Sequence, residues 1–382
     1  MSPPSSRTHP VIHLDDATVL DLLDLPTVTE RVAEAFAAWG RGTASTTQRV
    51  RAAAGGGMAS AMAAVVPPFS GGKIYATRDG RFTFLNVLFD EQGRLLCTLD
   101  GTGLTRLRTP AACALAIRHL AAPGAGTAAV IGAGLHTWHH VEMLRAEMPD
   151  LGELRIHARR PEAATALVDR AVRDGIPARA AATASEAVDG ADVVITVTTA
   201  REPLFPADAV ADRALICAVG ATKADRCEIA PEVVARCAAV VADDAVGSRT
   251  ECGDLIRAEA AGGFSWDGTI ELHALAAGTA TAPRAGDRGP VLFETQGVAV
   301  QDVAAAGLAW ERYVASYPGS DGDGGAPDGR HRPHDPSGVG SRQGREGSRR
   351  LGGRPGAHHT RDLDGRHGRH QPDDPDPEED IP

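Results

Sequence analysis

A glycine-rich turn near the middle of the chain constrains the fold more than any other feature of the sequence. Residues 128–137 read Ala-Ala-Val-Ile-Gly-Ala-Gly-Leu-His-Thr: a short apolar run, a turn at Gly132 and Gly134, and a helix-like segment to about Met148. A strand, a tight turn and a helix in this order expose backbone amides and a helix N-terminus where a pyrophosphate binds. The third fingerprint position holds Thr137 instead of glycine or alanine, so the motif alone is weak. It predicts a dinucleotide-binding site.

The segments that follow the turn alternate between strand-like and helix-like patterns. The sequence predicts strands at Leu154–His157, Ala191–Val197 and Ala214–Val219, with helices at Glu162–Arg173 and Ser185–Val188. Such alternation is typical of an α/β fold with a Rossmann-type doubly wound parallel sheet. A glycine turn in an unrelated α/β domain is the alternative.

The end of the second strand in this unit indicates which nicotinamide cofactor to expect. A site for NAD usually places an acidic residue there to bind the ribose 2′-hydroxyl, whereas a site for NADP places positive charge. The chain reads His157-Ala-Arg159-Arg160-Pro161, without an acid. Because Arg159 and Arg160 can form charge-assisted hydrogen bonds with a 2′-phosphate, the sequence favours NADP over NAD. The alternative is that both arginines are solvated loop residues.

Composition restricts the class of protein and its partners. With 382 residues and 43% hydrophobic content, the chain can form two ordinary cores, and no apolar run approaches the ~20 residues of a membrane span. The N-terminus, Met-Ser-Pro-Pro-Ser-Ser-Arg, lacks the apolar segment of a signal peptide, so we expect a cytoplasmic protein without a membrane partner. A net charge of −11 argues against nucleic-acid binding. A small molecule is therefore the expected partner.

The cysteines form no recognisable metal or redox motif. Six of them lie scattered through apolar surroundings, without the paired spacing of a zinc site, at positions 97, 113, 217, 227, 237 and 252. We expect reduced, mostly buried thiols and no bound metal.

The chain on either side of the predicted Rossmann unit has its own patterns. Before it, Thr27–Trp39 has helical periodicity, Arg81–Phe89 and Leu95–Leu99 resemble paired strands, and a long helix is predicted from Leu104. A helix at Val298–Val314 comes too late for the central sheet and is expected to return to the first domain. The predicted organisation is an α+β domain at residues 1–120, completed by residues 296–318, and a Rossmann domain at residues 121–295.

The C-terminal part of the sequence has a different composition. Residues 319–382 contain few apolar side chains and no aromatic ones, while Gly, Pro, Asp, Arg and His dominate. Such a segment cannot bury enough surface to offset its chain entropy, so we predict a disordered tail. Its histidines suggest a metal site, but they have no fixed spacing that would support one.

Several short blocks occur in an order that resembles one protein family. They are Gly72-Lys73, Leu104-Thr-x-x-Arg108-Thr109-x-Ala111, Ile131-Gly-Ala-Gly134, Ala191-Asp-Val-Val194, Ala218-Val-Gly-Ala221, Gly253-Asp254 and Gly297-x-Ala-x-Gln-Asp302. Over about residues 12–316 the chain resembles the ornithine cyclodeaminase/mu-crystallin family. The resemblance implies a homodimer in which the first domain, completed by the C-terminal helix, forms the subunit interface and the substrate pocket. The Rossmann domain would bind a nicotinamide cofactor.

The resemblance also implies positions for substrate and cofactor. Arg49, Lys73 and Arg108 fall where the family places the cations that hold an amino-acid carboxylate, and a lysine can also donate to the carbon–nitrogen centre. The alternatives are surface arginines and a solvated strand-edge lysine. The residues expected at the cofactor are Thr109, Gly132, Gly134, Leu135, His136, Arg159, Arg160, Thr198 and Val219.

One position departs from the pattern of cyclodeaminases in this family. Those enzymes usually follow the equivalent of Gly220-Ala221 with an aspartate that engages the substrate's distal amine, and this chain has Thr222. A threonine cannot act as a carboxylate base at neutral pH. Further along, Asp225 and Glu228 are the candidate catalytic proton carriers, alongside Lys73. The alternative for both acids is a charge at the N-terminus of a helix at Ile229–Arg236.

These features favour a reaction simpler than cyclodeamination. We expect NAD(P)-dependent hydride transfer at the α-carbon of an amino acid or a cyclic or linear imino acid, as in ketimine reductases and amino-acid dehydrogenases. One alternative is an ornithine or lysine cyclodeaminase that releases ammonia. The other is a non-catalytic protein that binds NADPH together with a ligand.

Overall fold

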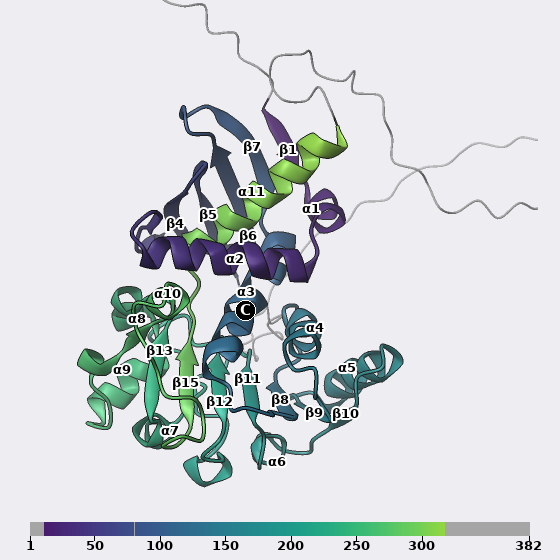
Figure 1. Cartoon of the computed structure of the whole chain (residues 1–382), viewed down its shortest axis with the longest axis vertical. Coiled ribbons are helices and arrows are strands. Elements are labelled where there is room, and N and C mark those ends of the chain that lie inside the picture. The colour runs from purple at the N-terminus through teal and green to yellow at the C-terminus, as the bar shows by residue number, and fades with distance from the viewer. Residues whose placement is uncertain (1–10, 80, 318–382) are drawn as a thin grey trace, which may run out of the picture.

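The computed structural model describes residues 11–79 and 81–317, which form two units that meet along one edge (Figure 1). The predicted tail at residues 319–382 and its histidines lie outside the described residues. One unit is a mixed sheet with helices on one face, and the other is a parallel sheet between helices. The helix α3 (Thr102–Leu120) leads from the first unit into the second and is buried along most of its length.

The first unit is built on a seven-stranded mixed sheet with the order β1-β7-β6-β5-β4-β2, in which β3 also pairs with β4. Strand β1 runs parallel to β7, and the other pairs are antiparallel. The strands are β1 (Ile12–Leu14), β2 (Ser45–Thr46), β3 (Val50–Ala54), β4 (Gly57–Val66), β5 (Phe69–Arg78), β6 (Arg81–Phe89) and β7 (Leu95–Asp100).

Helices cover one face of this sheet. The short α1 (Asp16–Leu22) precedes α2 (Leu25–Gly40), which starts before the predicted Thr27 because Asp24 accepts a hydrogen bond from the backbone of Thr27 as N-cap. From the far end of the chain, α11 (Ala299–Ser316) crosses back and packs against β4, β5 and α2 (Figure 1). The bidentate pair of Arg31 with Glu311 joins α2 to α11.

The second unit is an eight-stranded sheet with the order β10-β9-β8-β11-β12-β15-β13-β14, and all of its pairs are parallel. The strands are β8 (Thr127–Ile131), β9 (Glu153–His157), β10 (Ala178–Ala180), β11 (Val193–Thr196), β12 (Leu215–Ala218), β13 (Ala239–Ala242), β14 (Ile270–Glu271) and β15 (Val291–Glu294). Its helices are α4 (Thr137–Glu147), α5 (Pro161–Arg173), α6 (Ala184–Val188), α7 (Pro231–Arg236), α8 (Ala245–Glu251), α9 (Gly253–Ala260) and α10 (Leu272–Ala276).

This topology confirms the predicted doubly wound parallel sheet. The chain reverses its direction across the sheet between β8 and β11, which are neighbours although two strands separate them in sequence. In open α/β sheets, ligands bind beyond the carboxyl ends of the strands at such a reversal point. Strands β11, β12 and β15 are fully buried and mostly apolar, which explains why they appear in the sequence as hydrophobic runs.

Candidate active site

A groove of about 600 Å³ lies at the carboxyl ends of β8, β9 and β11. Gly132 forms its floor with φ of +125°, and a Cβ atom there would lie 2.3 Å from the carbonyl oxygen of Val197. Only glycine fits this backbone conformation and this contact. The glycine turn therefore presents bare backbone to the groove, as a dinucleotide pyrophosphate requires.

The rim of the groove is basic. Arg159 and Arg160 follow β9, are exposed and line the groove, and Arg201 and Arg226 line it as well. No aspartate or glutamate of the described residues is among the lining residues. The donor set therefore suits a polyanionic nucleotide.

A second cavity, of about 110 Å³, lies between the mixed sheet and the Rossmann unit and shares Val197 with the groove. Its walls combine five basic side chains with aromatic and apolar ones, and no carboxylate among the described residues lines it. The basic residues are Arg49, Arg51, Lys73, Arg108 and Lys223. The apolar wall includes Met58, Met62, Tyr75, Phe82 and Phe84.

Lys73 lies on the inner face of β5, completely enclosed. Its Nζ donates to Thr105 Oγ1 at 2.7 Å, lies 3.4 Å from Asp302 Oδ1 and sits 4.3 Å from the centre of the Phe84 ring. Burial lowers the pKa of Lys73 to about 7; nearby Arg108 and Arg49 lower it as well, and Asp302 opposes them. A lysine with this pKa can both donate and accept a proton near neutral pH.

Arg108 projects from α3 toward the N-terminal turn of α11. Its Nε donates to Asp302 Oδ1 at 3.2 Å and its Nη1 to Gln301 Oε1 at 2.6 Å, whereas Nη2 makes no hydrogen bond to a described residue. Gly297, at φ of +80°, lets the backbone pack on the guanidinium, because a Cβ there would lie 2.5 Å from Arg108 Nη1. One terminal nitrogen thus remains available to a ligand in the cavity.

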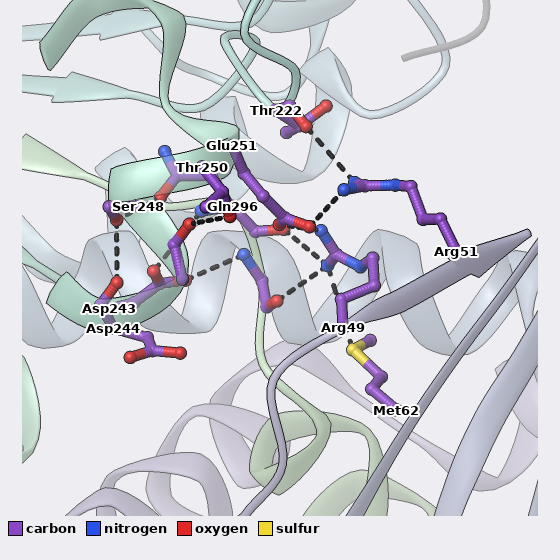
Figure 2. A network of polar contacts seen from close by, with 12 residues as sticks. Arg49, Arg51, Met62, Thr222, Asp243, Asp244, Ser248, Thr250, Glu251 and Gln296 are labelled. Carbon is purple, nitrogen blue, oxygen red and sulfur yellow. Dashed lines mark hydrogen bonds and ion pairs between the residues drawn. The ribbon is translucent and has the colours of Figure 1, made fainter. Parts of the chain in front are cut away.

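Arg49 and Arg51 reach from the β3 segment to a single carboxylate of the Rossmann unit, Glu251 at the end of α8 (Figure 2). Arg49 Nη1 lies 2.5 Å from Glu251 Oε2, and its Nη2 donates to the carbonyls of Gln296 and Gly297 at 2.8 and 2.7 Å. Arg51 pairs with the other oxygen of Glu251 and approaches the carbonyl of Thr222 at 3.5 Å. Arg49 is therefore held firmly, with its buried Nε left without a partner.

Glu228 is completely buried behind the cofactor groove and lines neither opening. Its carboxylate accepts hydrogen bonds from the Thr196 and Thr198 hydroxyls and from the backbone amides of Thr198 and Gly220, all at 2.7 to 2.8 Å. Helix α7 starts at Pro231 and Glu228 does not cap it, so the alternative of a helix N-terminal charge was wrong for this residue. Burial and nearby Asp254 raise the pKa of Glu228 to about 7, opposed by these donors.

The structure separates the remaining predicted residues into three groups. Gly132, Gly134, Arg159, Arg160 and Thr198 line the groove. Thr109, His136 and Val219 line the cavity instead, beside Arg49, Lys73 and Arg108. Leu135 and Asp225 line neither, and exposed Asp225 lies 3.6 Å from Arg201.

Sequence reasoning missed the partners that orient the cations. Thr105, Gln301 and Asp302 occur in the family blocks, but no role was predicted for them, and Glu251 occurs in no block. Glu251 is 202 residues from Arg49 and had no local signal. An acidic side chain of one unit that pairs with two basic side chains of the other can be identified only when the two units are packed together.

Other features restrict what the described residues can do. They contain no group of three or more side chains arranged to hold a metal ion. None of the helices in the described ranges is long and apolar enough to cross a bilayer. All six cysteines have free thiols, and five of them are buried.

Comparison with known proteins gives a consistent result. Delta(1)-pyrroline-2-carboxylate/Delta(1)-piperideine-2-carboxylate reductase of Azospirillum brasilense is 34% identical over 229 residues, 59% of this chain and 69% of that protein. The structure of a probable ornithine cyclodeaminase from Bordetella pertussis Tohama I superposes with a TM-score of 0.75 at 34% identity, covering 80% of this chain and 98% of that one.

A second solved structure is similar over the same extent. It is Thermococcus litoralis Delta(1)-pyrroline-2-carboxylate reductase in complex with NADH and L-proline, with a TM-score of 0.75 at 25% identity, covering 80% of this chain and 98% of that one. The family model described as "Ornithine cyclodeaminase/mu-crystallin family" matches residues 12–316. The chain therefore belongs to the ornithine cyclodeaminase/mu-crystallin family.

Proposed function

We propose that this protein is an NAD(P)-dependent oxidoreductase that reduces an imino acid at its α-carbon, or oxidises the corresponding amino acid. The observation that carries the proposal is the junction of the cofactor groove and the cationic cavity at Val197. A nicotinamide ring entering from the groove would meet a substrate held beside Lys73 and Arg108. The similar reductase bound to NADH and L-proline supports this combination of ligands.

The cavity favours reduction over cyclodeamination. A cyclodeaminase has to manage the distal ammonium of ornithine or lysine, and a carboxylate is the group that does so. Thr222 lines the cavity at the position where the family's cyclodeaminases carry an aspartate, and no carboxylate of the described residues lines it. Positive charge around the cavity would repel a distal ammonium group.

The chain's own residues can perform the steps that imine reduction requires. Arg108, through its available Nη2, binds the α-carboxylate, and the buried charge of Arg49 adds to the attraction. Bound NAD(P)H supplies the hydride that becomes the α-hydrogen. Lys73 donates a proton to the imine nitrogen and is held in place by Thr105 and Asp302. Glu228 acts as a positioning residue, because it fixes Thr198 at the edge of the groove.

We infer that NADP is the preferred cofactor. Arg159 and Arg160 stand at the end of β9, where an NAD site would carry an acid that receives the ribose hydroxyl. A 2′-phosphate there gains charge-assisted hydrogen bonds that the 2′-hydroxyl of NAD does not.

The test is cofactor oxidation by the purified full-length chain with a panel of imino acids. We expect reduction of at least one cyclic or linear 2-imino acid, faster with NADPH than with NADH at equal concentration. Ammonia release from ornithine or lysine without net cofactor consumption would favour cyclodeamination instead. Tight NADPH binding without any turnover would favour the non-catalytic alternative.

We also propose a homodimer that forms through the uncovered face of the mixed sheet. On that face Ile74 pairs with Leu85 across β5 and β6, and they are 50% and 37% exposed; Val65, on β4, is 47% exposed. Adjacent uncovered apolar side chains on one sheet face are typical of an interface. The cytoplasmic location expected from the sequence stays a prediction.

Replacing Ile74 by aspartate is expected to convert the dimer to a monomer of 39.6 kDa. In a two-fold symmetric interface each substitution occurs twice, so two charges would be buried against apolar surface. Light scattering coupled to size exclusion measures the mass. Val172→Asp is the matched control, because Val172 is 54% exposed on α5 of the Rossmann unit. A wild-type monomer, or an I74D dimer, would contradict the proposal.

A further inference from the structure

Lysine is rare in this chain, and its two occurrences share one cavity. Of 39 lysines and arginines in the full sequence, only Lys73 and Lys223 are lysine, and both line the cavity. A lysine differs from arginine in offering a compact, mobile ammonium rather than a planar fork. Lys73 is assigned to the imine nitrogen by the proposed function, which leaves Lys223 without a role.

The charges around the cavity do not balance. Five cations line it, and among the described residues two carboxylates pair with them: Glu251 with Arg49 and Arg51, and Asp302 with Lys73 and Arg108. A substrate with one α-carboxylate adds a single negative charge. At least one cation therefore remains uncompensated, even when Lys73 is neutral. Unpaired positive charge in a partly enclosed site attracts a second anionic group.

The uncompensated charge belongs to Lys223. Lys223 forms no ion pair with any described residue, whereas the other four cations each contact a carboxylate. Arg51 comes within 3.5 Å of the carbonyl of Thr222, the residue next to Lys223 (Figure 2). Lys223 and Arg51 therefore both line the cavity next to Thr222.

We propose that Lys223, with Arg51 beside it, binds a second carboxylate, so that the preferred substrate is a 2-imino or 2-amino dicarboxylic acid. The inference rests on the proposed function and specifies its substrate class. The α-carboxylate lies at Arg108, the reacting carbon and nitrogen lie between Val197 and Lys73, and the distal carboxylate lies at Lys223. The reaction remains hydride and proton addition across the C=N bond, and the distal group takes no part in it.

The experiment compares two linear imino acids that differ only in the second carboxylate. Iminosuccinate forms from oxaloacetate and ammonia, and iminopropionate forms from pyruvate and ammonia. The full-length chain is assayed as wild type, Lys223→Ala and Lys223→Arg. Arg94→Ala is a control for the loss of one positive charge, since this side chain is 76% exposed at a distant turn.

We expect wild type to have a higher kcat/KM for iminosuccinate than for iminopropionate. Lys223→Ala should raise KM for iminosuccinate by about 10- to 100-fold, the usual effect of losing a hydrogen bond between charged groups, and should cost iminopropionate much less. Lys223→Arg should recover most of the loss, and Arg94→Ala should alter neither substrate. An equal loss for both substrates, or a wild type that prefers iminopropionate, overturns the inference while the proposed function stands.

A binding measurement separates failure of the subsite from failure of catalysis. Acetylation by an amine-reactive ester can be followed at Lys223 by mass spectrometry, because peptides that carry Lys223 and Lys73, the two lysines of the chain, have different masses. Succinate should slow this acetylation and propionate should not. Protection by succinate without turnover of any imino acid supports the subsite and overturns the proposed function. Equal rates with succinate and propionate overturn the subsite.

Discussion

Replacing Lys73 by methionine is expected to lower kcat for imine reduction by about 10²- to 10⁴-fold, the usual contribution of a positioned general acid. Methionine has a similar length and suits the buried site beside Phe84. The substitution leaves Asp302 paired with Arg108, so no carboxylate is left without a cation. Cofactor binding should change little, because Lys73 lines the cavity and not the groove. Stopped-flow measurement of cofactor oxidation checks the rate, and fluorescence titration checks cofactor affinity.

The pH dependence of the wild type provides the control for this result. The pKa of Lys73 lies at about 7, so the ammonium form that donates the proton is lost as the pH rises above that value. The rate of imine reduction should therefore fall above about pH 7, and amino-acid oxidation, which needs the neutral amine as base, should rise over the same range. Lys73→Met should show neither the fall in the rate of reduction nor the rise in the rate of oxidation. Identical pH–rate profiles in wild type and Lys73→Met would assign the titration to another group.

The sequence predicted the Rossmann unit well because its signals are local. A buried parallel strand produces an unbroken apolar run, as in β11 and β12, and the tight turn after β8 requires Gly132. Predicted and observed strands differ by one or two residues at their ends, since a hydrophobic run continues past the last ladder hydrogen bond. The fold class is confirmed on these elements.

The electrostatics of the site could not be predicted from the sequence. Lys73 meets Asp302 across 229 positions, and Arg108 meets it across 194, so no periodic pattern links them. Whether a cation is available to a ligand depends on how fully such partners occupy it. The structure leaves Nη2 of Arg108 without a partner among the described residues, whereas both terminal nitrogens of Arg49 bind Glu251 or backbone carbonyls. Nothing in the sequence indicates this difference.

The structure strengthens the inference drawn from Thr222. In the sequence, a threonine in place of the aspartate of cyclodeaminases indicates only that a carboxylate base is missing. The cavity adds that no other described carboxylate replaces it and that two cations lie nearby. A missing acid and a nearby excess of positive charge act in the same direction, because both disfavour an ammonium and favour an anion.

Replacing Arg108 by leucine is expected to raise KM for the imino acid by about 10²- to 10³-fold, within the cost of removing one partner of a buried charged pair. The α-carboxylate would lose the buried guanidinium whose Nη2 has no hydrogen-bond partner among the described residues. Asp302 would retain Lys73 as its partner. Steady-state kinetics at saturating cofactor measures the change.

The same variant should also alter the pH profile, which a purely structural defect would not do. The positive charge of Arg108 lowers the pKa of Lys73, so its removal raises that pKa. A raised pKa keeps Lys73 protonated to a higher pH, and the alkaline fall in the rate of reduction should move upward accordingly. Arg108→Lys keeps the charge and should leave the limb near its wild-type position while recovering part of the KM. An unshifted limb in Arg108→Leu, in a protein whose thermal stability matches wild type, would show that Arg108 does not act on Lys73. An unchanged KM would place the α-carboxylate elsewhere in the cavity.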